Sequence, residues 1–375
     1  MPNPTPAIQA ATAARTWFSR GRDKAWLCLL AAALLQSACS KAPPQVAELA
    51  GRTMGTSYSV KLSPAPDERE RAALQRQVEQ RLQVINQQMS TYLPDSDLMR
   101  FNRTGTTDWQ AQPAALVTLV EQANRVSELS DGQYDITVGP LVDLWGFGSS
   151  GGRDSPPTQQ EIDTLLSQVG YQHLQTRLDP PALRKTVADL QVDLSSIAKG
   201  WAVDQIAELL RAKGFENFLV EIGGEVLARG EKSSGKPWRI AIEQPSFESR
   251  AIQRVIELRN MAMATSGDYR NFFTDGGQIY SHTIDPGTGQ SVQHRLASVT
   301  VLADNCTTAD AWATALMALG DQRAPRRADE LGLSALFIIR ATNGVLEQPS
   351  RALSESGLWR AQLDRPLPRS TTGGD

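Results

Sequence analysis

Five strand-like segments follow one another through the middle of the chain with only short loops between them. They are NFLVEI (217–222), WRIAIE (238–243), RVIELRNMAMAT (254–265), QIYSHTI (278–284) and ASVTVLA (297–303). Strands joined by short connections favour antiparallel pairing, because a parallel pair needs a long crossover. This run therefore constrains the fold more than any other feature.

Helical patterns occur in blocks on either side of these strands. Apolar residues recur at three- and four-residue spacing over 74–89, 116–129, 196–210 and 306–320. Two further strands are expected, at 57–62 and 334–340. The pattern predicts an α+β fold with largely antiparallel sheets flanked by helices. It disfavours a two-lobed solute-binding protein, whose lobes repeat βαβ units.

The N-terminus has an export pattern. Basic residues precede an apolar run at 25–35, which is too short to span a bilayer as a stable anchor. The sequence LQSAC then ends at Cys39 and is similar to a bacterial lipobox, although Gln36 stands where an aliphatic residue is usual. Two interpretations remain: lipidation of Cys39, which we favour, or ordinary signal-peptidase cleavage with Cys39 incidental.

These observations divide the chain into four parts. We expect a lipoprotein-type signal peptide over 1–38, a tether over 39–50, one large domain over 51–362 and a disordered tail over 363–375. With a lipid on Cys39, the domain would lie on the periplasmic side of a membrane in the bacterial cell envelope.

Composition excludes several classes of function. The net charge is −3 and no basic stripe occurs, which argues against a nucleic-acid partner. Cys28 and Cys39 belong to the N-terminal segment, so Cys306 has no partner for an internal disulfide. The single remaining cysteine excludes a cysteine-based metal site, and the presence of only three histidines argues against a multi-histidine zinc site.

The helix predicted at 306–320 carries an unusual polar pair. Asp310 and Thr314 stand one turn apart, so both oxygens project from one face of a largely apolar helix. Thr307 or Thr308 could cap this helix, with Asp310 favoured by the helix dipole in the first turn. Alternatively, the two oxygens are hard ligands of the type that Mg²⁺ selects, and Ser196 could add a third.

Two other segments have both a structural and a functional interpretation. Asp193, Ser196 and Lys199 stand where a helix begins, which suits either capping or the binding of an anion. His282 is either a structural histidine or a proton acceptor near neutral pH. A metal, a phosphate site and a histidine base together indicate chemistry at a phosphoryl group, without a P-loop or kinase signature.

Eight ordered segments resemble the ApbE-like FAD:protein FMN transferases, over most of residues 51–345. They are MGTSYSV (54–60), MSTYLPDSDLMRFN (89–102), DITVGPLVDLWGFG (135–148), DLSSIAKGWAVD (193–204), EIGGEV (221–226), ATSGDYRN (264–271), HTIDPGTG (282–289) and ADAWATALMALG (309–320). The resemblance implies an ApbE, tunnelling-fold-like architecture for the domain.

The resemblance also implies an activity and a set of site residues. The family transfers FMN from FAD to a threonine, sometimes a serine, of membrane redox-complex subunits, with Mg²⁺ required and AMP released. By resemblance, His282 is the catalytic base, and Ser196, Asp310 and Thr314 hold the metal. The positions expected to contact FAD are Met54, Tyr92, Asp135, Asp193, Lys199 and Ile284. Glu225 departs from the aspartate or asparagine common there, so no contact is assigned to it.

Two alternatives to the transferase remain open from the sequence. Plain hydrolysis of FAD to FMN and AMP would use the same residues, with water replacing the threonine. A non-catalytic, flavin-binding lipoprotein would not need Ser196, His282, Asp310 and Thr314 together.

Overall fold

The computed structural model describes residues 46–148, 151–232, 235–245, 252–269, 271–342 and 344–358. The predicted signal peptide, Cys39, most of the tether and the C-terminal tail lie outside the described residues. Among the residues that are described, no helix has both the length and the hydropathy needed to cross a bilayer.

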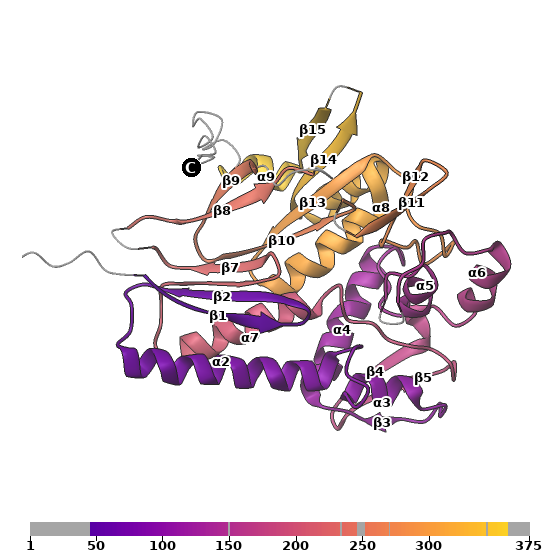
Figure 1. Ribbon diagram of the computed structural model, residues 1–375, viewed down its shortest axis with the longest axis horizontal. Coiled ribbons are helices and arrows are strands. Elements are labelled where there is room, and N and C mark those ends of the chain that lie inside the picture. The colour runs from indigo at the N-terminus through magenta and orange to yellow at the C-terminus, as the bar shows by residue number, and fades with distance from the viewer. Residues whose placement is uncertain are drawn as a thin grey trace, which may run out of the picture. The chain divides into compact units, whose positions relative to one another are not determined.

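An eight-stranded sheet forms the centre of the fold, and every neighbouring pair in it is antiparallel. Its order is β1-β2-β6-β7-β10-β13-β14-β15 (Figure 1). The strands are β1 (Ala47–Thr53), β2 (Thr56–Leu62), β6 (Phe218–Ile222), β7 (Glu225–Arg229), β10 (Met261–Gly267), β13 (Leu296–Ala303), β14 (Ser334–Ala341) and β15 (Gly344–Pro349). The α+β prediction with largely antiparallel strands is confirmed.

Smaller sheets and helices surround this sheet. A three-stranded sheet has the order β3-β5-β4 and consists of β3 (Gln110–Ala111), β4 (Leu174–Leu178) and β5 (Pro181–Lys185). Two further sheets have two strands each: β8 (Trp238–Glu243) pairs with β9 (Ile252–Leu258), and β11 (Phe272–Asp275) pairs with β12 (Gln278–Ser281). The helices are α2 (Glu68–Met89), α3 (Asp97–Arg103), α4 (Ala114–Leu129), α5 (Gly139–Leu144), α6 (Gln159–Leu166), the 3₁₀ turn η1 (Tyr171–His173), α7 (Ala198–Ala212), α8 (Cys306–Leu331) and α9 (Arg351–Glu355).

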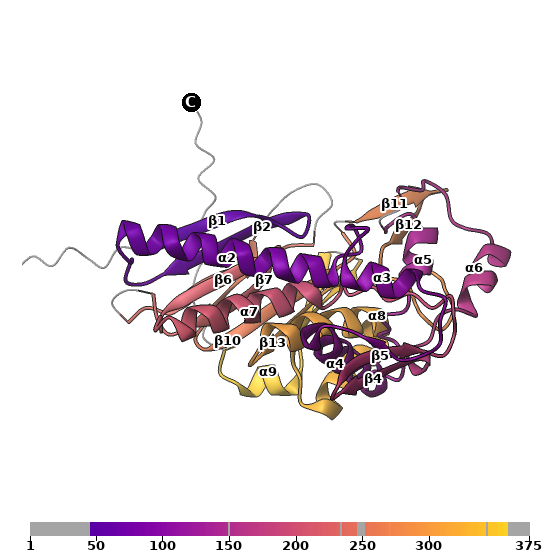
Figure 2. The ribbon, with the colours of Figure 1, turned by 90° about the horizontal axis from the view of Figure 1, so that it is seen from below.

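The two faces of the large sheet are covered differently. Helices α2, α7 and α8 cover one face, as the two ribbon views show (Figures 1 and 2). The main core lies there, because the apolar stripe of α2 predicted from sequence (Leu74 to Met89) is buried. On the other face, β8, β9 and α9 enclose a second core that includes Trp238, Met263 and Leu353.

Four local expectations differ from the structure. The segment 254–265 is not one strand: Asn260, at a φ of 50°, turns the chain between β9 and β10, which join different sheets. The strand expected at 278–284 ends at Ser281. Residues 47–50 of the expected tether form half of β1, because Leu49 is buried in the main core.

The fourth difference concerns α8. Neither Thr307 nor Thr308 caps it; the side chain of Asn305 accepts the hydrogen bond from the Thr308 N–H at 2.8 Å. The helix also continues past Gly320, where a φ of 75° produces a kink. A side chain at that glycine would meet the His294 ring at 2.7 Å, so the kink and the close approach require glycine together.

Candidate active site

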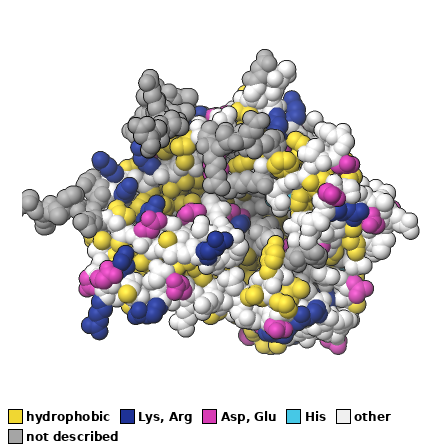
Figure 3. All heavy atoms as spheres, in the orientation of Figure 1, with side chains coloured by type: hydrophobic (Ala, Val, Ile, Leu, Met, Phe, Trp, Pro, Cys, Tyr) yellow, Lys and Arg dark blue, Asp and Glu magenta, His cyan; other side chains and the backbone are white. Residues whose placement is uncertain are grey.

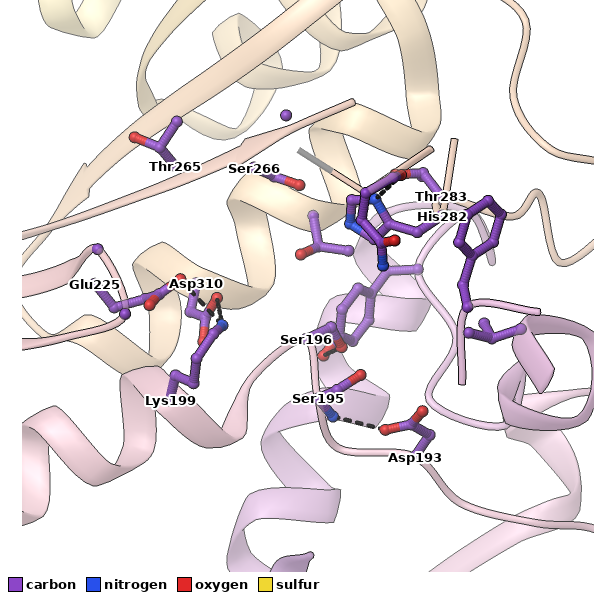
Figure 4. Close-up of a pocket in the computed structure, with 18 of the residues that line it drawn as sticks. Asp193, Ser195, Ser196, Lys199, Glu225, Thr265, Ser266, His282, Thr283 and Asp310 are labelled. Atoms are coloured by element: carbon purple, nitrogen blue, oxygen red, sulfur yellow. Dashed lines mark hydrogen bonds and ion pairs between the residues drawn. The ribbon is translucent and has the colours of Figure 1, made fainter. Parts of the chain in front are cut away.

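A cavity of about 750 Å³ lies where the starts of α7 and α8 meet the ends of the sheet strands and the loop after β12. Figure 4 shows a close-up of its lining. It brings together most of the site residues expected from sequence: Tyr92, Asp135, Asp193, Ser196, Lys199, His282, Ile284, Asp310 and Thr314. Segments more than 200 residues apart in the sequence therefore contribute to one site, since both Tyr92 and Thr314 line it.

Met54 is the expected contact that the cavity leaves out. It lies in the turn between β1 and β2 with a φ of 48°, and the described residues that line the cavity do not include it. A partly buried Met54 packs against the main core instead.

Lys199 and two buried carboxylates form the charged centre of the cavity (Figure 4). The Lys199 Nζ lies 3.0 Å from Glu225 Oε1 and 3.7 Å from Asp310 Oδ1. Burial alone would lower the pKa of Lys199, but the charges of Asp310 and Glu225 raise it above its ordinary value. Lys199 is therefore a fixed cation at the start of α7.

Asp310 also joins the two helices. Its Oδ2 accepts a hydrogen bond from the Gly200 N–H at 2.9 Å. A Cβ at Gly200 would lie 2.4 Å from the Cys306 carbonyl oxygen and 2.8 Å from Asp310 Cβ, so only glycine permits this approach of α7 to α8. Burial raises the pKa of Asp310, while Lys199 and the Gly200 N–H oppose the shift.

Glu225 is one site residue to which the sequence assigned no contact. It is 5 % exposed, and burial with the nearby Asp310 charge raises its pKa to about 7 against the opposing effect of Lys199. Its second oxygen, Oε2, is buried without a hydrogen-bond partner. The only signal in the sequence was the preceding pair Gly223-Gly224, whose φ values of 64° and 105° turn the chain between β6 and β7.

Tyr134 is a second residue that the sequence did not reveal. Ser196 Oγ donates a hydrogen bond to the Tyr134 hydroxyl oxygen at 2.9 Å. Burial raises the pKa of Tyr134 above its ordinary value, so the phenol stays protonated. Because the Ser196 hydroxyl donates its hydrogen to Tyr134, the lone pairs of Ser196 Oγ are available to a ligand in the cavity.

Asp135 and Asp193 are held by local hydrogen bonds. Asp135 accepts from the Thr137 N–H and hydroxyl at 2.7 and 2.6 Å and from the Tyr171 N–H at 2.8 Å. Asp193 accepts from the Ser195 N–H at 2.8 Å. Burial raises the pKa of both carboxyls. Their first role is thus to fix loops of the cavity wall, and the expected contact with FAD stays a prediction.

His282 follows β12 and lies beside an aromatic cluster. Its ring meets Phe147 edge-on, with ring centroids 6.4 Å apart. The His282 Nδ1 lies 3.3 Å from the Asn271 carbonyl oxygen. If Nδ1 donates to that carbonyl, Nε2 is the proton acceptor. Burial lowers the pKa of His282 below its ordinary value of about 6.5, so the imidazole is neutral at pH 7.

The oxygen groups of the cavity fit a hard cation. Asp310 and Thr314 both line it one turn apart on α8, with the Ser196 hydroxyl opposite at the start of α7. The unpartnered Glu225 Oε2 is one further oxygen. Within the described residues, no three His, Cys, Asp or Glu side chains are grouped for a metal. The possible donors are thus carboxylate and hydroxyl oxygens, the ligand type that hard cations such as Mg²⁺ prefer.

Comparison with known proteins gives a consistent family. The sequence profile of the ApbE family matches residues 54–337. A protein from Vibrio cholerae serotype O1 named FAD:protein FMN transferase is 43 % identical over 325 residues, which is 87 % of this chain and 96 % of that protein. A protein of the same name from Escherichia coli K12 is 38 % identical over 84 % of this chain and 92 % of its own.

Solved structures similar to this chain belong to the same family. The flavin transferase ApbE from Vibrio cholerae superposes with a TM-score of 0.76 at 42 % identity, over 83 % of this chain and 99 % of that one. The apo form of the Pseudomonas stutzeri flavinyl transferase ApbE superposes with a TM-score of 0.77 at 39 % identity, over 84 % of this chain and 98 % of that one. The matched segments contain the whole cavity described above, and the chain belongs to the ApbE family.

Proposed function

We propose that this protein is a Mg²⁺-dependent FAD:protein FMN transferase, which moves FMN from FAD onto a threonine or serine hydroxyl of a target redox protein and releases AMP. One observation carries the proposal: His282 lines the same cavity as the Lys199–Glu225–Asp310 cluster. A proton acceptor, the Lys199 cation and carboxylate oxygens for a metal thus line one cavity. The names of the relatives support the same activity.

The reaction assigns a role to each group. The acceptor hydroxyl oxygen bonds to the FMN-side phosphorus, its proton passes to His282, and the bond from that phosphorus to the bridging oxygen breaks, so that AMP leaves with the electron pair. Lys199 would hold the diphosphate through its fixed positive charge. Asp310, Thr314 and Ser196 would hold Mg²⁺, which neutralises part of the diphosphate charge.

The remaining groups would position the flavin nucleotide. Tyr92 is 70 % exposed at the cavity, so its ring is free to stack on a flavin or adenine. Ile284 is buried among the aromatic and aliphatic residues around Trp145 and lines the cavity. Asp135 and Asp193 would orient the nucleotide from the loops that they stabilise.

Mass spectrometry tests the transfer directly. The purified full chain is incubated with FAD, Mg²⁺ and a soluble, threonine-bearing domain of a membrane redox-complex subunit. We expect the acceptor to gain the mass of FMN with stoichiometric release of AMP, and chelation to abolish both. An acceptor whose threonine is replaced by alanine is the matched control.

Other products would change the assignment. Free FMN and AMP with unmodified acceptor domains from every redox complex of the host would identify a hydrolase. Bound but unconverted FAD would identify a flavin carrier. Either result would contradict the proposed transferase activity.

We further propose that the protein acts on the periplasmic side of a membrane, anchored by a lipid on Cys39. The lipobox-like LQSAC sequence and the short apolar run before it support the proposal. We expect the Cys39→Ala variant to lose incorporation of labelled palmitate and to leave the membrane fraction. Cys28→Ala, in the apolar run, is the control and should stay lipidated. A Cys39→Ala protein that remains labelled and membrane-bound would contradict the anchor.

A further inference from the structure

The cavity extends well beyond the charged centre, onto the face of the large sheet opposite α2 and α7. Ser59 pairs with Glu221, Glu221 with Val226, and Val226 with Met263. Residues directly opposite each other on neighbouring strands share a face, so these four side chains form one row across β2, β6, β7 and β10. All four line the cavity. A second pair, Lys61 and Leu219, lies beside the row.

This row leads to the reactive groups. Thr265 lies two residues beyond Met263 on β10, on the same face, and it too lines the cavity. Figure 4 places Thr265 and Ser266 on the strand that passes between Glu225 and His282. Gly223 and Gly224, in the turn after β6, are also part of the lining. The row is therefore continuous with the site of chemistry.

Strand β8 forms the side of this extension. The residues Arg239 to Glu243 line the cavity consecutively. Because side chains alternate between the faces of a strand, a cavity that touches five residues in succession runs along the strand's edge. Within the described part of the chain, β8 pairs with β9 alone. Every second residue of that edge directs its N–H and C=O away from β9. We call this extension, from Ser59 to β8, the β8 groove.

We propose that the β8 groove binds an extended segment of the acceptor polypeptide, which adds as a strand to the open edge of β8 and thereby brings its hydroxyl to His282. This inference rests on the proposed transferase function. An open strand edge supplies backbone donors and acceptors at the spacing of another backbone, as in other complexes formed by strand addition. A flavin nucleotide has no such repeating groups.

The side chains of the groove indicate the chemistry of the segment. Leu219, Val226 and Met263 are apolar and almost fully buried in the core between the sheet and β8, so they form the apolar floor beneath the groove. Lys61 and the exposed Arg239 are basic, whereas Glu221 is acidic. On the face shown in Figure 3, hydrophobic side chains are likewise interspersed with both charges. The groove thus fits a mixed polar and apolar peptide rather than a polyanion.

The groove is also separate from the residues expected to hold FAD. Tyr92, Asp135, Asp193, Lys199 and Ile284 lie on the loops and helices of the other part of the cavity. None of them comes from β2, β6, β8 or β10. The competing occupant is nevertheless part of FAD itself, and the experiment has to separate the two.

Charge reversal in the groove provides the test. We expect a Lys61→Glu/Arg239→Glu double variant to raise the KM for the acceptor domain by about tenfold or more, since both changes alter contacts to the docked peptide. The Kd for FAD, measured by flavin fluorescence, should stay within about twofold of the wild type. Arg76→Glu changes charge in the same way on α2, which covers the opposite face, and should alter neither quantity.

A cross-linking measurement does not depend on lost activity. With a photoreactive phenylalanine analogue in place of Ala241, an exposed residue of β8, we expect a covalent adduct with the acceptor domain; the same analogue at Arg76 should give none. An unchanged acceptor KM with no adduct would overturn the docking site. So would a weakened FAD Kd in the double variant, because part of FAD would then occupy the groove. Both outcomes leave wild-type transfer intact, whereas absence of wild-type transfer would overturn the proposed function itself.

Discussion

The Asp310→Ala variant should lose Mg²⁺-dependent turnover of FAD by about two to three orders of magnitude and still fold. The size is taken by analogy from the removal of one preorganised group that stabilises charge in a transition state, where loss of one oxyanion-hole donor costs about 10²- to 10³-fold. The substitution removes the only carboxylate among the expected metal ligands and one of the two partners of Lys199. Lys199 would then pair with Glu225 alone, so its ammonium group would be positioned less rigidly beside the diphosphate.

The fold should tolerate the change. The Gly200 N–H loses its acceptor, which costs about 1–3 kcal/mol for a buried donor. This is less than the ~5–15 kcal/mol by which folded domains are usually stable. Removing a buried carboxylate also removes its desolvation cost, since Asp310 is only 4 % exposed.

Asp204 offers a matched control for this prediction. It is a carboxylate on α7, the helix that Asp310 contacts through Gly200, and it accepts hydrogen bonds from the N–H groups of Cys306 and Thr307 at the start of α8. It does not line the active-site cavity. Asp204→Asn should therefore lower the melting temperature while leaving the Mg²⁺ dependence of turnover unchanged. Calorimetric titration with Mg²⁺ and turnover over a Mg²⁺ series would distinguish the two variants, and full Mg²⁺-dependent activity of Asp310→Ala would remove the metal assignment.

Periodic features of the fold were accessible from the sequence, whereas features set by tertiary contacts were not. The stripe on α2 and the alternation in β2 are local patterns that burial on one face imposes. The division between β9 and β10 depends on Asn260 adopting a left-handed conformation, which no pattern in the surrounding apolar residues predicts. The inclusion of residues 47–50 in β1 likewise depends on pairing with β2.

The same distinction applies to the site. Asp310, Lys199 and His282 were recognisable because each lies in an ordered segment that resembles a family. Glu225 also lies in such a segment but departs from the residue common there, and its burial and its contact with Lys199 come from the packing of β7 against α7. The role of Tyr134 as acceptor from Ser196 arises in the same way, from two segments 62 residues apart. Sequence patterns thus predicted which residues meet in the cavity, while the pairing among them required coordinates.

The His282→Ala variant should bind FAD normally and transfer FMN about 10²- to 10⁴-fold more slowly, which is the usual contribution of a general base. FAD binding should persist because no hydrogen bond or ion pair among the described residues joins His282 to Lys199, Glu225 or Asp310. Single-turnover transfer to the acceptor domain measures the rate, and flavin fluorescence measures the Kd. His173→Ala is the control, because His173 lies outside the cavity and its Nδ1 lies 3.0 Å from the Thr186 hydroxyl.

The pH profile separates a base from a merely structural histidine. Burial lowers the pKa of His282, so its neutral form, which alone accepts a proton, is fully populated above the ordinary histidine value of about 6.5. As the pH falls through the lowered pKa, the imidazole is protonated and transfer by the wild type should decline, with its acidic limb below pH 6.5. The variant has no such group, so its residual rate should lack that limb. Undiminished transfer by His282→Ala, or an acidic limb that survives the substitution, would mean that another group removes the hydroxyl proton.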